Sequence, residues 1–171
     1  MKHLIAFVVF IFCNCMLTPS LSALSIGRDG SSYVQDGIEW QNICYKDSDA
    51  GFTGTLPGSP WSGISDGWAY SYSKYNGVLF EFHTELGAIY NPPETEKEFI
   101  NGLYEVFGTK ASISPISSPQ KNVKYCAEMI FKNGNKIGRV FCSENRLYWA
   151  IVDGADLSLA PFVFDSFQVT Q

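Results

Sequence analysis

Clustered positive charge and internal repeats are both absent from this sequence of 171 residues. Charged residues make up only 17% of it, with 12 Lys and Arg against 17 Asp and Glu, and the basic residues form no cluster. Nucleic acids and anionic membrane surfaces are recognised through concentrated Lys and Arg, so we expect neither as a partner. No repeat with a period of about 20–50 residues is visible, which excludes a solenoid or a propeller.

Histidine is also scarce, and this limits metal chemistry. Only two histidines occur, and His83 has no Cys, Asp or second His at ligand spacing, so we expect no zinc site. Asp47, Asp49 and Gly51 resemble the start of a calcium loop, but Gly58 stands where the bidentate acid is needed. We therefore predict a solvated turn there, no bound metal and no cofactor.

The N-terminus has the pattern of a secretory signal peptide. A short positive region, Lys2–His3, precedes the apolar run Leu4–Leu17, and small residues follow with cleavage expected after Ser22 or Ala23. The apolar run is shorter than the roughly 20 residues that a membrane-spanning helix needs. We predict a signal peptide over 1–23, export to the periplasm or outside the cell, and no membrane contact after cleavage.

The remaining chain divides into a short segment and one domain. Residues 24–37 are rich in Gly, Ser and Asp without periodicity, so a flexible N-terminal segment is predicted. Residues 38–171 are predicted to form a single globular domain, and we expect a monomer. Without Lys2 the exported chain has 17 acidic and 11 basic residues, a net charge of −6.

Three consecutive antiparallel strands are predicted over 121–152, and the rest of the chain is organised around them. Asn133–Gly134 suits a two-residue type I′ turn, which pairs Glu128 with Arg139 across the first hairpin. The last strand, Leu147–Val152, is apolar at nearly every position, as expected of a central strand covered on both faces.

The same turn decides the expected state of the cysteines. Cys44, Cys126 and Cys142 remain after signal cleavage, and export permits oxidation of two of them. A three-residue loop over 133–135 sets Cys126 opposite Cys142, whereas the two-residue turn sets them on opposite faces, beyond disulfide geometry. The second alternative predicts no bridge between them.

The other elements complete an α+β fold class. Further strands are expected at 38–45, 52–56, 68–73 and 78–84, with a strand or extended loop at 109–120. Helices are expected at 94–107, stopped by Gly108, and after residue 160, with Pro161 in the first turn. These elements predict an antiparallel sheet of about six to seven strands with helices packed on its faces.

Two stretches suggest a functional site. Gly63–Gly67 matches the G-x-S-x-G pattern of a nucleophile elbow, but a Pro/Gly loop precedes it and a strand pattern follows. If Tyr75 pairs with Val78 across Asn76–Gly77, one face of the hairpin gathers three rings, a carboxylate and the histidine: Trp68, Tyr70, Tyr72, Glu81 and His83. Such a face either binds a sugar, peptide or amphipathic ligand, or is covered by a helix with His83 hydrogen-bonded at the edge.

Two motifs resemble a known family. Gly51–Pro60 looks like the "gF-x-v-x-lPg-x-P" motif near the start of small exported bacterial domains with a PsbP-like fold. Asn145–Tyr148, followed by Phe164–Phe167, resembles the motif at the C-terminal end of these domains. The resemblance covers roughly 38–169 and implies an α/β/α sandwich. It implies no catalytic residues, and no photosynthetic role is transferred because a thylakoid transit signal is lacking.

Three functions remain open at this point. The first is a non-enzymatic exported domain that binds a protein or small-molecule ligand through the five residues of the hairpin face. The second is a small serine hydrolase that uses Ser65 and His83. The third is a structural or assembly subunit that docks a partner through exposed aromatic residues.

Overall fold

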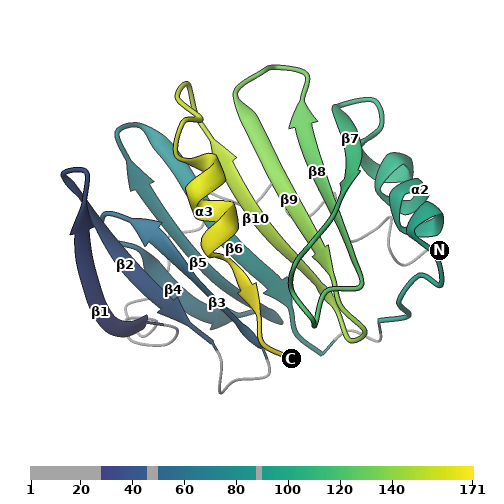
Figure 1. Ribbon diagram of the computed structural model, residues 1–171, viewed down its shortest axis with the longest axis horizontal. Coiled ribbons are helices and arrows are strands. Elements are labelled where there is room, and N and C mark those ends of the chain that lie inside the picture. The colour runs from purple at the N-terminus through teal and green to yellow at the C-terminus, as the bar shows by residue number, and fades with distance from the viewer. Residues whose placement is uncertain (1–27, 46–49, 88–89) are drawn as a thin grey trace.

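The computed structural model describes residues 28–45, 50–87 and 90–171, so the predicted signal peptide lies outside the described residues. They form two antiparallel sheets and two helices (Figure 1). The four-stranded sheet has the order β1-β2-β3-β11 and the seven-stranded sheet the order β4-β5-β6-β10-β9-β8-β7. The strands are β1 Arg28–Gln35, β2 Ile38–Cys44, β3 Phe52–Pro57, β4 Trp61–Ser65, β5 Trp68–Tyr75, β6 Val78–Glu85, β7 Ala111–Ile116, β8 Tyr125–Phe131, β9 Lys136–Cys142, β10 Leu147–Asp153 and β11 Gln168–Val169, and the helices are α2 Glu96–Phe107 and α3 Ala160–Ser166. Neither of these helices is long and apolar enough to cross a membrane.

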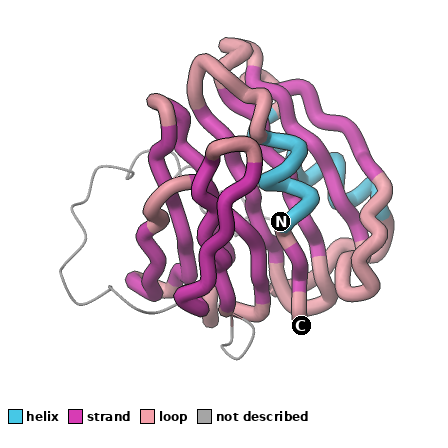
Figure 2. The backbone as a smooth tube through the Cα atoms, turned by 60° about the vertical axis from the view of Figure 1, so that its left-hand side comes forward, coloured by secondary structure: helices cyan, strands magenta, loops and turns pink. Residues whose placement is uncertain are grey.

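The larger sheet has a buried core on each face. On one face, side chains of β6 and β10 pack with the smaller sheet and α3, with Phe82 and Phe167 rings 4.9 Å apart (Figures 1 and 2). On the other face, α2 packs on β7 and β8, where Phe99, Leu103 and Phe107 are buried. The two cores explain why β10, in the middle of the sheet, is apolar along its length.

The fold class is confirmed as largely antiparallel sheet, but the second layer differs from the prediction. Opposite β6 and β10 lies mainly a four-stranded sheet, with the short α3 beside it, rather than a layer of helices. Part of that sheet comes from the segment expected to be flexible, because Arg28–Gln35 forms β1 and pairs with β2. Residues 31–35 are all exposed, so no alternation of buried and exposed side chains marks this part of β1 in the sequence.

Short turns set the register of the hairpins. Asp36–Gly37, Asp66–Gly67 and Asn76–Gly77 all have positive φ at both residues, as type I′ turns require. At Asn133–Gly134 only Gly134 does (φ +73°), so the predicted type I′ turn is wrong there, and Gly134 N–H donates to Phe131 in a longer loop. The predicted register is nevertheless confirmed, because Glu128 pairs with Arg139.

The same register separates two cysteines. Cys126 belongs to the core under the smaller sheet and Cys142 to the core under α2. Both are free, as is Cys44, so the expected absence of a bridge between Cys126 and Cys142 is confirmed. Burial raises the pKa of the Cys126 thiol to about 12.

Helix α2 begins and ends at specific caps. The Thr95 hydroxyl accepts a hydrogen bond from Glu98 N–H at 3.2 Å, which satisfies one of the free donors of the first turn. Gly108 ends the helix as predicted, but with right-handed φ (−57°) rather than in the left-handed region. Its role is steric, because a Cβ there lies 2.6 Å from the Tyr104 carbonyl oxygen.

Candidate functional site

The candidate site lies on the hairpin of β5 and β6. Tyr75 pairs with Val78 as predicted, which places Tyr72 opposite Glu81 and Tyr70 opposite His83. Residues opposite one another share a face of the sheet, so the predicted rings, carboxylate and histidine lie together.

Hydrogen bonds on the other face of the hairpin fix its position. Ser73 donates to the Pro57 carbonyl at 2.6 Å, and the hydroxyls of Ser71 and Ser62 lie 2.7 Å apart. The Tyr45 hydroxyl lies within 2.9 Å of the carbonyl oxygen of Gly63 and 2.8 Å of that of Tyr70. Because this face is held against the smaller sheet, the rings of Trp68, Tyr70 and Tyr72 lie on the opposite face of β5.

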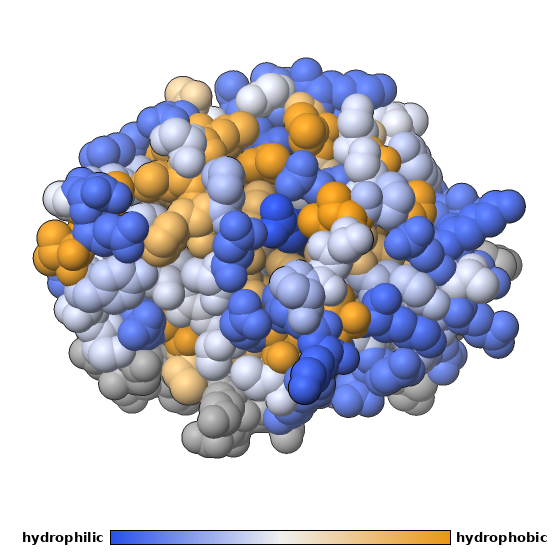
Figure 3. Space-filling model, viewed as in Figure 1, coloured by the Kyte–Doolittle hydropathy of each residue, from blue (hydrophilic) through white to orange (hydrophobic). Residues whose placement is uncertain are grey.

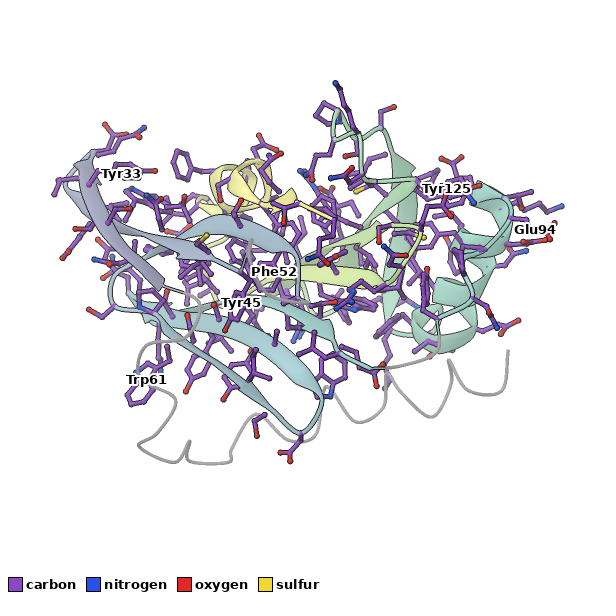
Figure 4. All side chains as sticks on the ribbon, turned by 90° about the horizontal axis from the view of Figure 1, so that it is seen from below. Tyr33, Tyr45, Phe52, Trp61, Glu94 and Tyr125 are labelled. Atoms are coloured by element: carbon purple, nitrogen blue, oxygen red, sulfur yellow. The ribbon has the colours of Figure 1, made fainter. Side chains whose placement is uncertain are left out.

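A further ring that the sequence analysis missed joins the site. Trp61 of β4 lies opposite Tyr72 and is 42% exposed. Figure 4 shows it projecting from the outer strand away from both sheets, whereas Tyr45 and Phe52 point between them. The alternation of Trp61, Gly63 and Ser65 before an Asp-Gly turn was the signal that could have identified β4 as a strand.

We call the set of six residues on this side of β4, β5 and β6 the aromatic face: Trp61, Trp68, Tyr70, Tyr72, Glu81 and His83. Trp68, Tyr70, Tyr72 and Glu81 are half-buried and His83 is buried, and the helix predicted over 94–107 is not the element that covers these rings. Helix α2 packs instead on β7 and β8, at the other end of the sheet. The Tyr70 and Tyr72 rings are nearly parallel, with centroids 6.2 Å apart.

His83 lies inside the face rather than at its edge. Its ring centroid is 5.8 Å from that of Trp68 and 6.2 Å from that of Trp149. Burial, with a smaller effect of the Lys136 charge, lowers the pKa of His83 from 6.5 to about 3, so the imidazole is neutral at neutral pH. Within the part of the chain that the structure describes, its Nε2 atom is buried without a hydrogen-bond partner.

The geometry around Ser65 differs from a nucleophile elbow. Ser65 ends β4, and a type I′ turn leads directly into β5, so no helix follows the serine. Its hydroxyl is 3.1 Å from the Asp66 carboxylate, to which it donates. Ser65 pairs with Trp68 and His83 with Tyr70, which sets the two Cα atoms about 12 Å apart from strand spacing and rise. This arrangement does not place His83 as a general base within hydrogen-bond reach of the Ser65 hydroxyl.

A second concave feature lies between α3 and the loop after β7. This cleft has a volume of about 270 Å³, and its walls include Cys126, Arg139 and Phe164. The Arg139 guanidinium already contacts Asp165 at 3.0 Å and Glu128 at 3.4 Å and lies over the Phe164 ring. Its charge is therefore occupied by structural contacts.

The described residues include no group of three His, Cys, Asp or Glu side chains placed to hold a metal ion. What the aromatic face offers chemically is ring area, a carboxylate and a neutral imidazole, which suit recognition of a ligand with both apolar and hydroxyl or amide surfaces. Comparison with known proteins finds no family model, no curated protein and no solved structure that matches the chain.

Proposed function

We propose that this protein is an exported, non-enzymatic domain that binds a protein segment or a small molecule on the aromatic face. The observation that supports the proposal is the alignment of half-exposed rings on adjacent strands: Trp61 opposite Tyr72, with Tyr70 and Trp68 along the same strand. Rings of this kind bury a large apolar area with little loss of side-chain freedom, and they are frequent at binding sites.

Ligand-induced stabilisation tests this proposal. Thermal unfolding of the purified protein is followed against panels of peptides and small molecules, for the wild type, Trp61→Ala and the control Tyr33→Ala. Tyr33 is an exposed ring (37%) on the other sheet, as Figure 4 shows. We expect ligands that raise the Tm of the wild type and of the control but not of Trp61→Ala. Ligands that stabilise all three proteins equally, or no stabilising ligand, would contradict a site on this face.

Export and a PsbP-like relationship belong to the same proposal. The first resembling motif includes β3, and the second includes the start of β10 and the end of α3. Thr55 N–H donates to the Ser166 hydroxyl at 3.0 Å, so β3 and α3 contact each other in the fold. Sequencing the N-terminus of the protein recovered from the periplasm or the medium tests the cleavage site. A first residue outside 23–24, or a chain that retains residues 1–23, would contradict the signal peptide.

An assembly role is the second candidate, and the edge strands favour it. Tyr33 and Val34 on β1, and Trp61 and Ile64 on β4, are large exposed apolar residues on the outermost of the described strands of the two sheets. Figure 3 shows hydrophobic side chains at the β1 end of the molecule. Sedimentation of wild type and Val34→Lys tests this role, since an assembly through β1 dissociates in the variant, and a monomeric wild type rules out self-assembly.

A further inference from the structure

We infer that Asn76, at the tip of the hairpin of β5 and β6, is a site of spontaneous covalent modification. Its side chain is converted there to aspartate and isoaspartate through a cyclic imide formed with the backbone of Gly77. The chain has three Asn-Gly sequences, beginning at Asn76, Asn101 and Asn133, and the structure distinguishes between them. The inference is independent of the proposed function, because it concerns a backbone turn and requires no ligand.

The reaction needs a glycine nitrogen that can act as a nucleophile. A base from the solvent takes the proton of the glycine N–H, and the nitrogen forms a bond to the carbonyl carbon of the asparagine side chain. The bond from that carbon to the side-chain nitrogen breaks, and ammonia leaves with a proton from water. Water then opens the imide at either carbonyl, which gives aspartate or isoaspartate. A hydrogen bond already made by the glycine N–H opposes the first step, because it must be broken.

The turn after β5 offers such a nitrogen. Asn76 and Gly77 are both exposed, with φ of +49° and +79°, and a turn of this type bonds its first and last residues, here Tyr75 and Val78. Nowhere in the described chain does the Gly77 N–H or the Asn76 side chain have a hydrogen-bond partner. A Cβ placed on Gly77 would meet no atom within 4 Å beyond its chain neighbours, so solvent reaches the nitrogen.

The other two Asn-Gly sequences have hydrogen-bonded glycine nitrogens. Gly102 lies within α2, where its N–H donates to the carbonyl four residues before it. Gly134 N–H donates to the Phe131 carbonyl at 2.9 Å, and the Asn133 Oδ1 atom accepts from Asn135 N–H at 3.3 Å. Losing one such bond before the reaction slows it by about two- to tenfold, so Asn76 should react first.

The products alter the turn that sets the register of the hairpin. Aspartate adds a negative charge, and isoaspartate also adds one carbon to the backbone, because the chain then runs through the side chain. A two-residue type I′ turn cannot take up an extra backbone atom and keep Tyr75 opposite Val78. We therefore expect the modified protein to be less stable than the unmodified one.

Ageing of the purified protein at mildly alkaline pH tests the inference. Peptide mapping by mass spectrometry follows the mass gained when an amide becomes a carboxyl, in the native protein and in urea, where all three sites are unfolded. We expect Asn76 to convert at least about twofold faster than Asn101 and Asn133 in the native protein, and the three rates to be similar in urea. Faster conversion of Asn101 or Asn133, equal native rates or no native conversion overturns the inference. The same preference for Asn76 in urea also overturns it, because the fold would then not be its cause.

Asn76→Gly provides the matched variant for the effect on stability, because Gly-Gly also suits a type I′ turn and cannot form the imide. Ageing should lower the Tm of the wild type and leave that of Asn76→Gly unchanged. The Asp-Gly turns at 36–37 and 66–67 are present in both proteins, so any change at them cancels in the comparison. An equal fall of Tm in both proteins would overturn the inferred effect on the hairpin.

Discussion

Replacing His83 by Phe should change how the stability of the protein depends on pH. Burial lowers the pKa of His83 from 6.5 to about 3 in the folded state, while the unfolded chain keeps the ordinary value. Above pH 6.5 the imidazole is neutral in both states and contributes no pH dependence. Between pH 6.5 and about 3 the unfolded state binds the extra proton, so the free energy of unfolding falls as the pH falls.

The size of the effect follows from the shift. Each pH unit below 6.5 removes up to about 1.4 kcal/mol, so by pH 4.5 the wild type loses about 3 kcal/mol through this one residue. His83→Phe has no such group and keeps an aromatic ring against Trp68 and Trp149. The Glu85 carboxyl, whose pKa burial raises, is present in both proteins, so its contribution cancels in the difference.

Urea unfolding followed by tryptophan fluorescence at pH 7.5, 6.5, 5.5 and 4.5 measures this difference. We expect the free energy of unfolding of the wild type to fall by about 3 kcal/mol more than that of His83→Phe between pH 6.5 and 4.5. Trp68→Phe serves as the matched control, because it alters the same cluster and keeps the histidine. Parallel curves for wild type and His83→Phe would refute the reasoning, since they would show that His83 titrates alike in both states.

Three further predictions concern the two cores. Gly54→Ala places a Cβ 2.5 Å from the Phe82 ring and should lower the free energy of unfolding by about 1–3 kcal/mol in urea. Arg139→Ala removes its ion pairs and the contact with the α3 ring beneath it, and should cost about 2 kcal/mol in the same assay. Among the three cysteines of the described chain, half-buried Cys44 should react first with a thiol reagent, and the two buried ones only after unfolding, as peptide mapping can show.

Each of these has an outcome that contradicts it. A Gly54→Ala protein as stable as the wild type would mean that β3 does not press on β6. For Arg139, the control is Lys132→Ala in the exposed loop, and equal losses in both variants would deny Arg139 its role between β9 and α3. Labelling of all cysteines at one rate in the native protein would contradict the burial of Cys126 and Cys142.

Local sequence patterns were sufficient to predict much of the hairpin pairing in the larger sheet. The turn residues of its hairpins, and the alternating apolar residues on each side, can be recognised in the sequence. The pairings of Tyr75 with Val78 and of Glu128 with Arg139 were therefore predicted correctly. A helix was predicted over 94–107, from apolar spacing that depends on nearby residues alone, and α2 spans Glu96–Phe107. The five predicted residues of the aromatic face share one side because strand register fixes side-chain direction.

Only the tertiary structure decided which faces are covered. Strand β1 buries no side chain of residues 31–35, and the sequence therefore gave no alternation by which to find it or the four-stranded sheet. Whether Trp68 lies under a helix depends on where α2 packs, and α2 packs on β7 and β8 because its buried residues fit the core there. The burial that keeps His83 neutral depends likewise on rings from separate strands, Trp68 and Trp149, which the sequence alone does not place beside it. The sequence by itself determined pairing within the hairpins 68–84 and 125–142, because that pairing depends on neighbouring residues. The pairing of β6 with β10 and the covering of each face depend on contacts between distant segments.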